Sequence, residues 1–190
     1  FPAARPAWPE DPRLHFDATL EPIVAGNTMY LGSSANDRLT AVDVRSGRVR
    51  WTYYADGPIR YAPIAHKGRI YFGSDDGNFY CLTSDTGKLV WKFPAAPGSR
   101  RVIGNERMIS VWPMRGGPVL HKNKIYFTIG VWPFEGNFLY TLDLTKSGAG
   151  GLPSFKMETL TSQLPQGYLV ASADQLLLPC GRGSAARRDL

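Results

Sequence analysis

Short runs of apolar residues, separated by turn residues, fill most of this chain. PIVAGNTMYLGS begins at Pro22, PIAHKGRIYFGS at Pro63 and PVLHKNKIYFTIG at Pro118. We find no apolar period typical of a helix extending over three turns. The joints between runs carry pairs such as Asp76-Gly77, which are typical of tight turns between antiparallel strands. The pattern therefore predicts an all-β fold.

The runs are copies of one repeat. Tyr30, Tyr71 and Tyr126 occupy the same position in three copies, and a weaker fourth copy, LVASADQLLLPCG, has Leu177 there. A period near 40 residues with several short strands in each copy is typical of a β-propeller blade. The expected strands are 22–25, 28–33, 38–44 and 48–55, then 63–66, 69–74, 78–84 and 89–95, then 118–121, 124–130, 137–144 and about 155–160, and finally 169–172 and 175–180.

This division gives about three and a half blades of four antiparallel strands within residues 22–181. The expected units are a proline-rich segment 1–21 containing Trp8, blades 22–62, 63–117 and 118–168, a partial blade 169–181, and a basic tail 182–190. A propeller needs at least four blades to close. We therefore expect a part of a larger propeller of seven or eight blades. Its open edges should pair with the rest of the propeller or with another copy of the chain.

Two segments, AVDVRSGRVRW at 41–51 and CLTSDTGKLVW at 81–91, carry a more specific resemblance. They resemble the tryptophan-docking motif of quinoprotein-type β-propellers, the PQQ-like repeat family. The first copy matches it at Ala41, Asp43, Ser46, Gly47 and Trp51, the second keeps Thr86, Gly87 and Trp91 but has Cys81 and Thr83 at the other two positions, and the third keeps Asp143. The resemblance implies that Trp51 and Trp91 stack on the adjacent blade and join the blades together.

The resemblance also implies two kinds of function. Quinoprotein dehydrogenases bind PQQ and calcium in eight blades, whereas propellers such as the barrel-assembly lipoproteins of bacterial outer membranes act as scaffolds without a cofactor. Both kinds typically lie outside the cytoplasm. The dehydrogenases commonly carry a vicinal disulfide and a carboxylate cluster around calcium, but this chain has only Cys81 and Cys180, and its acidic residues lie mostly in turns.

We therefore expect a non-catalytic, extracytoplasmic binding or scaffold module without a cofactor. The alternative is a fragment of a PQQ-dependent quinoprotein oxidoreductase that holds PQQ with calcium. A third reading is that any catalysis belongs to a domain beyond residue 190. Fold alone does not decide among these functions.

Charge and histidine placement add two weaker hypotheses. The formal net charge is +6, but much of the positive charge is scattered over turns, which argues against nucleic acid as the partner. No apolar run approaches the length of a membrane span. His66 and His121 share one repeat position, as a metal pair could require, yet no cysteine or carboxylate recurs there. We expect these histidines to be turn residues.

Two lengthened connections indicate where a functional surface lies. The chain runs 12 residues from Trp51 to Pro63 but 27 from Trp91 to Pro118, and the loop between the second and third strands of the third blade is also longer. Because antiparallel strands alternate in direction, both connections emerge at the same face. They should bring together the candidate binding residues Arg100, Arg101, Arg107, Trp112, Arg115, Trp132 and Glu135.

Two readings of this set stay open. The tryptophans and arginines could bind a protein partner or a small anionic or aromatic ligand, since both residue types dominate interface hot spots. Alternatively, the tryptophans pack the long loop against the blade and the arginines are solvated.

Overall fold

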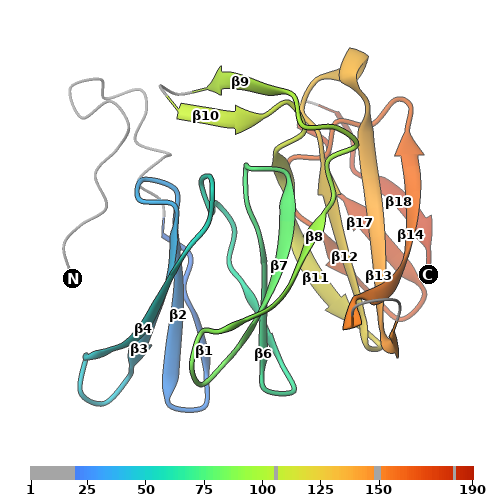
Figure 1. Cartoon of the computed structure of the whole chain (residues 1–190). Helices are drawn as coiled ribbons and strands as arrows, with labels where there is room; N and C mark the ends of the chain where they lie inside the picture. Colours follow the sequence, from blue (N-terminus) through green and yellow to red (C-terminus); the bar gives the residue numbers. More distant parts are fainter. Residues whose placement is uncertain (1–19, 105–106, 148–150, 182) are drawn as a thin grey trace.

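The computed structural model describes residues 20–104, 107–147, 151–181 and 183–190. They form a row of antiparallel sheets, and no α-helix occurs in these ranges (Figure 1). The expected segment 1–21 with Trp8 lies almost wholly outside the described residues. No helix of the described part is long and apolar enough to cross a membrane.

The first two blades are regular four-stranded sheets whose strands follow chain order. Blade 1 consists of β1 (Ile23–Ala25), β2 (Thr28–Ser33), β3 (Arg38–Asp43) and β4 (Val49–Tyr54). Blade 2 consists of β5 (Ile64–His66), β6 (Arg69–Gly73), β7 (Asn78–Thr83) and β8 (Leu89–Pro94). The expectation of four antiparallel strands per copy is confirmed for these blades.

Blade 3 has the same four antiparallel strands and one addition. It consists of β11 (Met114–His121), β12 (Lys124–Ile129), β13 (Asn137–Ser147) and β14 (Pro153–Leu160). A short strand, β15 (Gly167–Tyr168), pairs in parallel with the free edge of β11. The sequence pattern did not indicate this fifth strand, because two residues carry no periodicity.

Blade 4 differs from the expected half blade and tail. It contains β16 (Val170–Ala171), β17 (Gln175–Leu178) and β18 (Ala186–Asp189). Residues 186–189, which the sequence analysis assigned to a basic tail, are a third antiparallel strand paired with β17. The two arginines made this segment resemble a solvated tail in the sequence. An edge strand accepts such charges because one of its faces is solvated.

The connection entering blade 3 contains a hairpin of its own. Strands β9 (Arg101–Gly104) and β10 (Arg107–Ser110) pair with each other and with no other strand. In Figure 1 this hairpin lies across one end of the first two sheets. A long loop was expected here, and the extra residues form a small, separate sheet instead.

Equivalent positions of the repeat have equivalent pairing. Tyr30 faces Ala41 across the sheet, Tyr71 faces Cys81, and Tyr126 faces Thr141. In blade 4 the corresponding pair is Leu177 with Arg187. The register of all four sheets therefore follows the alignment of the repeat.

The turn between the third and fourth strands is fixed by a side chain at one position. The Oδ1 atom of Asp43 accepts the backbone N–H groups of Arg45 and Ser46 at 3.0 and 2.8 Å. A hydrogen bond from Arg50, supported by the backbone N–H and hydroxyl of Ser46, holds the pKa of Asp43 well below its usual range. In blade 2 the hydroxyl oxygen of Thr83 serves as the acceptor for the N–H of Lys88. A hydroxyl can replace the carboxylate here because the turn needs only an acceptor.

Trp51 touches the next blade directly. Its indole N–H donates to the carbonyl oxygen of Ser84 in blade 2 at 3.0 Å, and the hydroxyl of Tyr30 donates to the same oxygen at 3.1 Å. Gly87 lies against the indole ring with φ of 66°, and a Cβ atom there would come within 2.6 Å of the ring. Only glycine fits this position.

Aromatic packing also joins blades 2 and 3. Phe79 and Phe127 stack with their ring centroids 4.3 Å apart. Trp91 belongs to the same buried cluster and lies 5.9 Å from the ring of Tyr71. In blade 3 the position of these tryptophans is taken by Lys156, which pairs with Thr141 and is exposed.

We predict that Trp51→Ala lowers the free energy of unfolding by about 3–5 kcal/mol, as for other large core aromatics. Trp51→Phe should cost about 1 kcal/mol, because it keeps most of the apolar contact and loses one hydrogen bond. Urea denaturation followed by circular dichroism measures both. Trp132→Ala is the matched control, since its side chain is 45% exposed. A Trp51→Ala chain as stable as the control would refute the role of this residue in joining the blades.

Candidate functional site

The two lengthened connections meet at one end of the sheets, as the strand directions predicted. The indole N–H of Trp112 donates to the carbonyl oxygen of Glu135 at 2.6 Å. The guanidinium of Arg100 lies over the indole ring of Trp112, 5.5 Å from its centroid, and forms an ion pair with the Glu135 carboxylate. These three residues are therefore brought together, and Trp112 is packed between the two loops.

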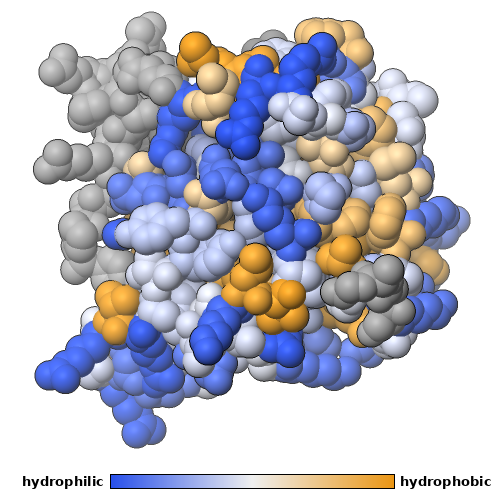
Figure 2. All heavy atoms as spheres, viewed as in Figure 1, coloured by the Kyte–Doolittle hydropathy of each residue, from blue (hydrophilic) through white to orange (hydrophobic). Residues whose placement is uncertain are grey.

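Trp132 lies beside this group but faces outward. Its ring stacks with that of Phe134, with centroids 6.2 Å apart, in the 3-10 turn η2 (Pro133–Glu135). Phe134 is 81% exposed. Ile103 and Met108, which are cross-strand partners in the hairpin, are exposed as well. Figure 2 shows apolar surface at this hairpin and at the β12–β13 connection, within a largely hydrophilic surround.

Arg107 is placed elsewhere, against blade 1. Its guanidinium donates to the carbonyl oxygens of Ser34 and Ala35 at 2.5 and 2.8 Å and forms an ion pair with Asp37. Burial raises the pKa of Asp37, and the charge of Arg107 partly opposes this rise. The hairpin thus reaches back over blade 2 and is held to blade 1. The sequence grouped Arg107 with the other arginines, but its contacts are within the chain.

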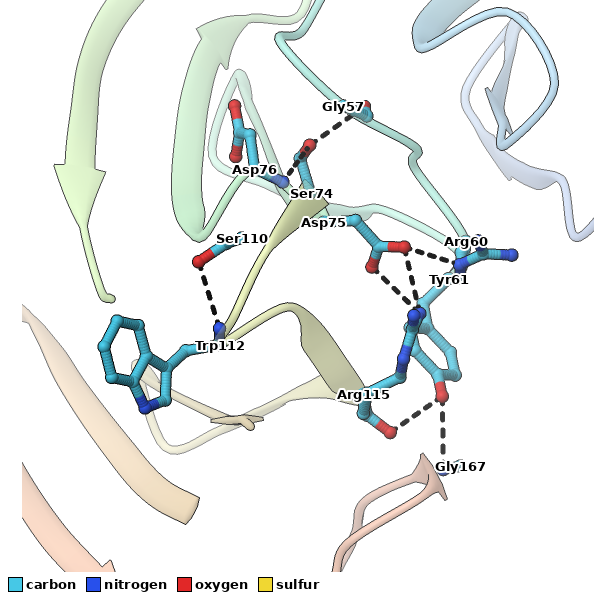
Figure 3. A network of polar contacts seen from close by, with 10 residues as sticks. All are labelled: Gly57, Arg60, Tyr61, Ser74, Asp75, Asp76, Ser110, Trp112, Arg115 and Gly167. Carbon is cyan, nitrogen blue, oxygen red and sulfur yellow. Dashed lines mark hydrogen bonds and ion pairs between the residues drawn. The ribbon is translucent and has the colours of Figure 1, made fainter. Parts of the chain in front are cut away.

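Arg115 also leaves the expected group. It lies on β11, where its Nη1 atom donates to both carboxylate oxygens of Asp75 at 2.9 and 3.0 Å. Arg60 donates to the same carboxylate through Nε at 2.7 Å (Figure 3). Asp75 is 1% exposed. Arg115 of β11 and Arg60 of the β4–β5 connection therefore surround one buried carboxylate.

A pair of tyrosines completes this inner network. The hydroxyl of Tyr61 donates to the carbonyl oxygen of Arg115 at 2.7 Å and accepts the N–H of Gly167 at 3.3 Å. The hydroxyl of Tyr168 accepts the N–H of Ala62 at 2.7 Å, and the two tyrosine rings meet edge to face. Burial raises the pKa of Tyr61. Strand β15 is thereby held against both blade 3 and the connection between blades 1 and 2.

Asp76 points away from its neighbour. Figure 3 shows the carboxylates of Asp75 and Asp76 directed to opposite sides of the turn. Asp76 accepts the backbone N–H of Asn78 at 2.9 Å and the hydroxyl hydrogen of Tyr80. Burial, reinforced by the carboxylate of Asp76, raises the pKa of Tyr80 far above its usual value. The two adjacent carboxylates therefore have different environments.

The sequence pattern did not predict five residues of this inner region: Arg60, Tyr61, Asp75, Asp76 and Tyr168. Two adjacent aspartates in the β6–β7 turn were a usable signal, because carboxylates next to each other at a strand end need partners. Arg101, in contrast, was nominated and lies at the start of β9 with an exposed side chain.

The two described histidines, His66 and His121, and the two cysteines lie in separate environments. The Nε2 atom of His66 lies 3.1 Å from the side-chain oxygen of Asn123, and the Nε2 atom of His121 is buried without a hydrogen-bond partner in the described part of the chain. Cys81 is buried and Cys180 is half-buried, and both are free thiols. Burial raises the pKa of Cys81 to about 12. Within the described ranges, no three histidine, cysteine or carboxylate side chains group as metal ligands would.

Comparison with known proteins supports the sequence resemblance. Methanol dehydrogenase [cytochrome c] subunit 1 of Paracoccus denitrificans is 28% identical over 160 residues, which cover 77% of this chain and 23% of that protein. The dehydrogenase subunit of alcohol dehydrogenase (quinone) from Gluconobacter oxydans is 26% identical over 115 residues, or 55% of this chain and 14% of that protein. This chain spans less than a quarter of the length of either relative.

A solved structure and a family model complete the comparison. The crystal structure of BamB from Moraxella catarrhalis superposes with a TM-score of 0.62 and 16% identity, covering 88% of this chain and 44% of that chain. This likeness confirms the β-propeller fold. The model of a family described as outer membrane protein assembly factor BamB matches residues 5–129. On that match the chain belongs to this family of PQQ-like propeller repeats.

Proposed function

We propose that this chain is a non-catalytic binding or scaffold module within a larger extracytoplasmic propeller. The observation that carries the proposal is that the carboxylate of Asp75 is paired with two arginines. This carboxylate is buried and is neutralised by ion pairs with Arg60 and Arg115. A carboxylate whose two oxygens are occupied by two arginines is not available as a general base or as a metal ligand.

The residues described do not fit a calcium–PQQ site. Calcium takes six to eight oxygen ligands, several of them carboxylates. Both carboxylate oxygens of Asp75 accept hydrogen bonds from Arg115, and the carboxylate of Asp76 is directed to the other side of the turn (Figure 3). The two thiols lie in different blades, so they cannot form a vicinal disulfide. We therefore assign no catalytic step to these residues.

The exposed aromatic pair supports a binding role. Trp132 and Phe134 stand on a turn between two packed strands, and loops on a rigid scaffold are common binding sites. Tryptophan and phenylalanine are enriched in protein interfaces relative to the rest of the surface. Trp112 and Arg107 instead hold the loops in place, which favours the packing reading for those two residues. A protein partner at the β12–β13 connection is the simplest proposal.

The second candidate function is a fragment of a quinoprotein oxidoreductase. It is favoured by the two dehydrogenase relatives, one of which aligns over 77% of this chain. In that case PQQ and its metal would be held by parts of the protein other than the residues described.

The first prediction of this proposal concerns the cofactor. We expect no saturable binding when the purified chain, in excess Ca²⁺, is titrated with PQQ at micromolar concentrations. Absorbance of PQQ and quenching of tryptophan fluorescence measure the binding. Saturable, Ca²⁺-dependent binding would overturn the proposal and favour the oxidoreductase fragment.

The second prediction concerns Asp75. Arg115→Met should lower the free energy of unfolding by about 3–5 kcal/mol, because it leaves a buried carboxylate with one partner. Adding Asp75→Asn to this variant should restore part of the loss, since no unpaired charge then remains buried. Thermal denaturation with and without Ca²⁺ tests the alternative. Recovery of the melting temperature of Arg115→Met in Ca²⁺ would show that the carboxylate serves a metal.

The third prediction separates binding from packing residues. Trp132→Ala and Phe134→Ala should leave the melting temperature nearly unchanged, whereas Arg107→Ala and Trp112→Ala should lower it. A photo-crosslinking residue at position 134 should form an adduct with a partner protein in cells that produce the full protein. The control is position 49, an exposed valine at the opposite end of the sheets. Equal adducts at both positions, or none at 134, would count against a partner surface here.

A further inference from the structure

A pocket of about 310 Å³ lies between blade 2 and the inserted hairpin. Its walls come from the β6–β7 turn, from the segment that follows β8, and from the ends of β9 and β10. Its volume is at the lower end of the range for small-molecule sites. The pocket lies on the side of the turn to which Asp76, not Asp75, belongs, so it is separate from the inner arginine network.

One wall of the pocket carries a buried negative charge. Asp76 is 7% exposed, and its carboxylate accepts hydrogen bonds from two neutral donors, the N–H of Asn78 and the hydroxyl of Tyr80. No ion pair to Asp76 occurs among the residues that the structure describes. Two of the roughly four acceptor positions of a carboxylate are thus in use. A buried carboxylate is normally paired with a cation, as Asp75 is, so the pocket side of Asp76 suits a positively charged group.

Positive charge also lines this pocket. Arg100 and Arg101 both line the pocket. Arg100 is engaged with Glu135 and Trp112. Arg101 is exposed, and the carboxylate that its charge acts on, Asp56, is already paired with Lys92 and does not line the pocket. Ser99 and Ser110 add hydroxyl groups, and Pro94 and Ala96 add a small apolar surface.

We propose that this pocket binds a small zwitterion of the α-amino-acid class. Its ammonium group would pair with Asp76, and its carboxylate with Arg101 and the serine hydroxyls. The charges of Asp76 and Arg101 sum to zero. A simple anion would therefore face the repulsion of Asp76, and a simple amine would leave the charge of Arg101 unmatched within the pocket. A ligand that carries both charges can pair with Asp76 and with Arg101. The small apolar surface of Pro94 and Ala96 leaves room only for a small side chain on this ligand.

The test compares a zwitterion with its two halves. The purified chain is titrated with L-alanine, propionate and propylamine, and binding is followed by saturation-transfer NMR and calorimetry. We expect saturable binding of L-alanine and at least about tenfold weaker binding of propionate and propylamine, since each lacks one charge-assisted contact. Equal binding of propionate or propylamine, or no binding of L-alanine, would overturn the proposal.

Two variants locate the site. Asp76→Asn keeps an acceptor for the Asn78 N–H group and so preserves the turn, and Arg101→Gln changes an exposed side chain. Each should weaken L-alanine binding at least about tenfold, with unchanged circular dichroism. Arg48→Gln, which alters an exposed arginine outside the pocket, is the matched control and should have no effect. Unchanged affinity in Arg101→Gln would refute the assignment. The outcome does not bear on the scaffold function, because that function uses a different surface.

Discussion

Each blade of this protein has two faces to bury, and this constraint sets most of the structure. A four-stranded sheet with apolar residues on both sides cannot be stable alone, so each face must pack on a neighbouring sheet. The buried clusters accordingly lie between blades: one joins blades 1 and 2, a second joins blades 2 and 3, and a third joins blades 3 and 4. The contacts of Trp51 also set the orientation of blade 1 relative to blade 2. A hydrogen bond to Ser84 and a glycine-only contact with Gly87 fix how far one sheet turns relative to the next.

The junction between blades 3 and 4 lacks the tryptophan contact. Lys156 lies in blade 3 at the position that Trp51 and Trp91 occupy in blades 1 and 2. Polar contacts join the outer part of this junction instead. Arg188 of β18 forms an ion pair with Glu158 of β14 at 2.8 Å and donates to the side chain of Gln163. Both charged groups are partly exposed, so the pair contributes little stability by itself. The apolar contacts between Tyr126, Leu139 and Leu176 therefore hold most of this junction.

The sequence predicted the repeated part of the fold well and the irregular part poorly. Repetition located the strands of blades 1 and 2, since turn glycines and alternating apolar positions recur there at fixed spacing. It missed β15, the β9–β10 hairpin and β18, which occur once and carry no repeated signal. The same limit applies to the candidate site. Loop length correctly predicted that Trp112 and Glu135 share a face, but it could not show that Arg107 reaches blade 1 or that Arg115 finds Asp75, because long side chains choose partners through tertiary contacts.

The functional question therefore depends on how charges are compensated, not on the fold. Asp75 and Asp76 are neighbours in one turn, yet one is surrounded by arginines and the other receives only neutral donors. An ion pair closed within the chain makes the first carboxylate part of the scaffold. The second retains capacity for an outside charge, and it lines a pocket that Arg100 and Arg101 also line. In a propeller, loops of many blades meet at one end. There, the charge of the partners that surround each of two adjacent side chains distinguishes a structural position from a binding position. The repeat dictates where a turn occurs, whereas the partners supplied by inserted segments decide what its side chains can do.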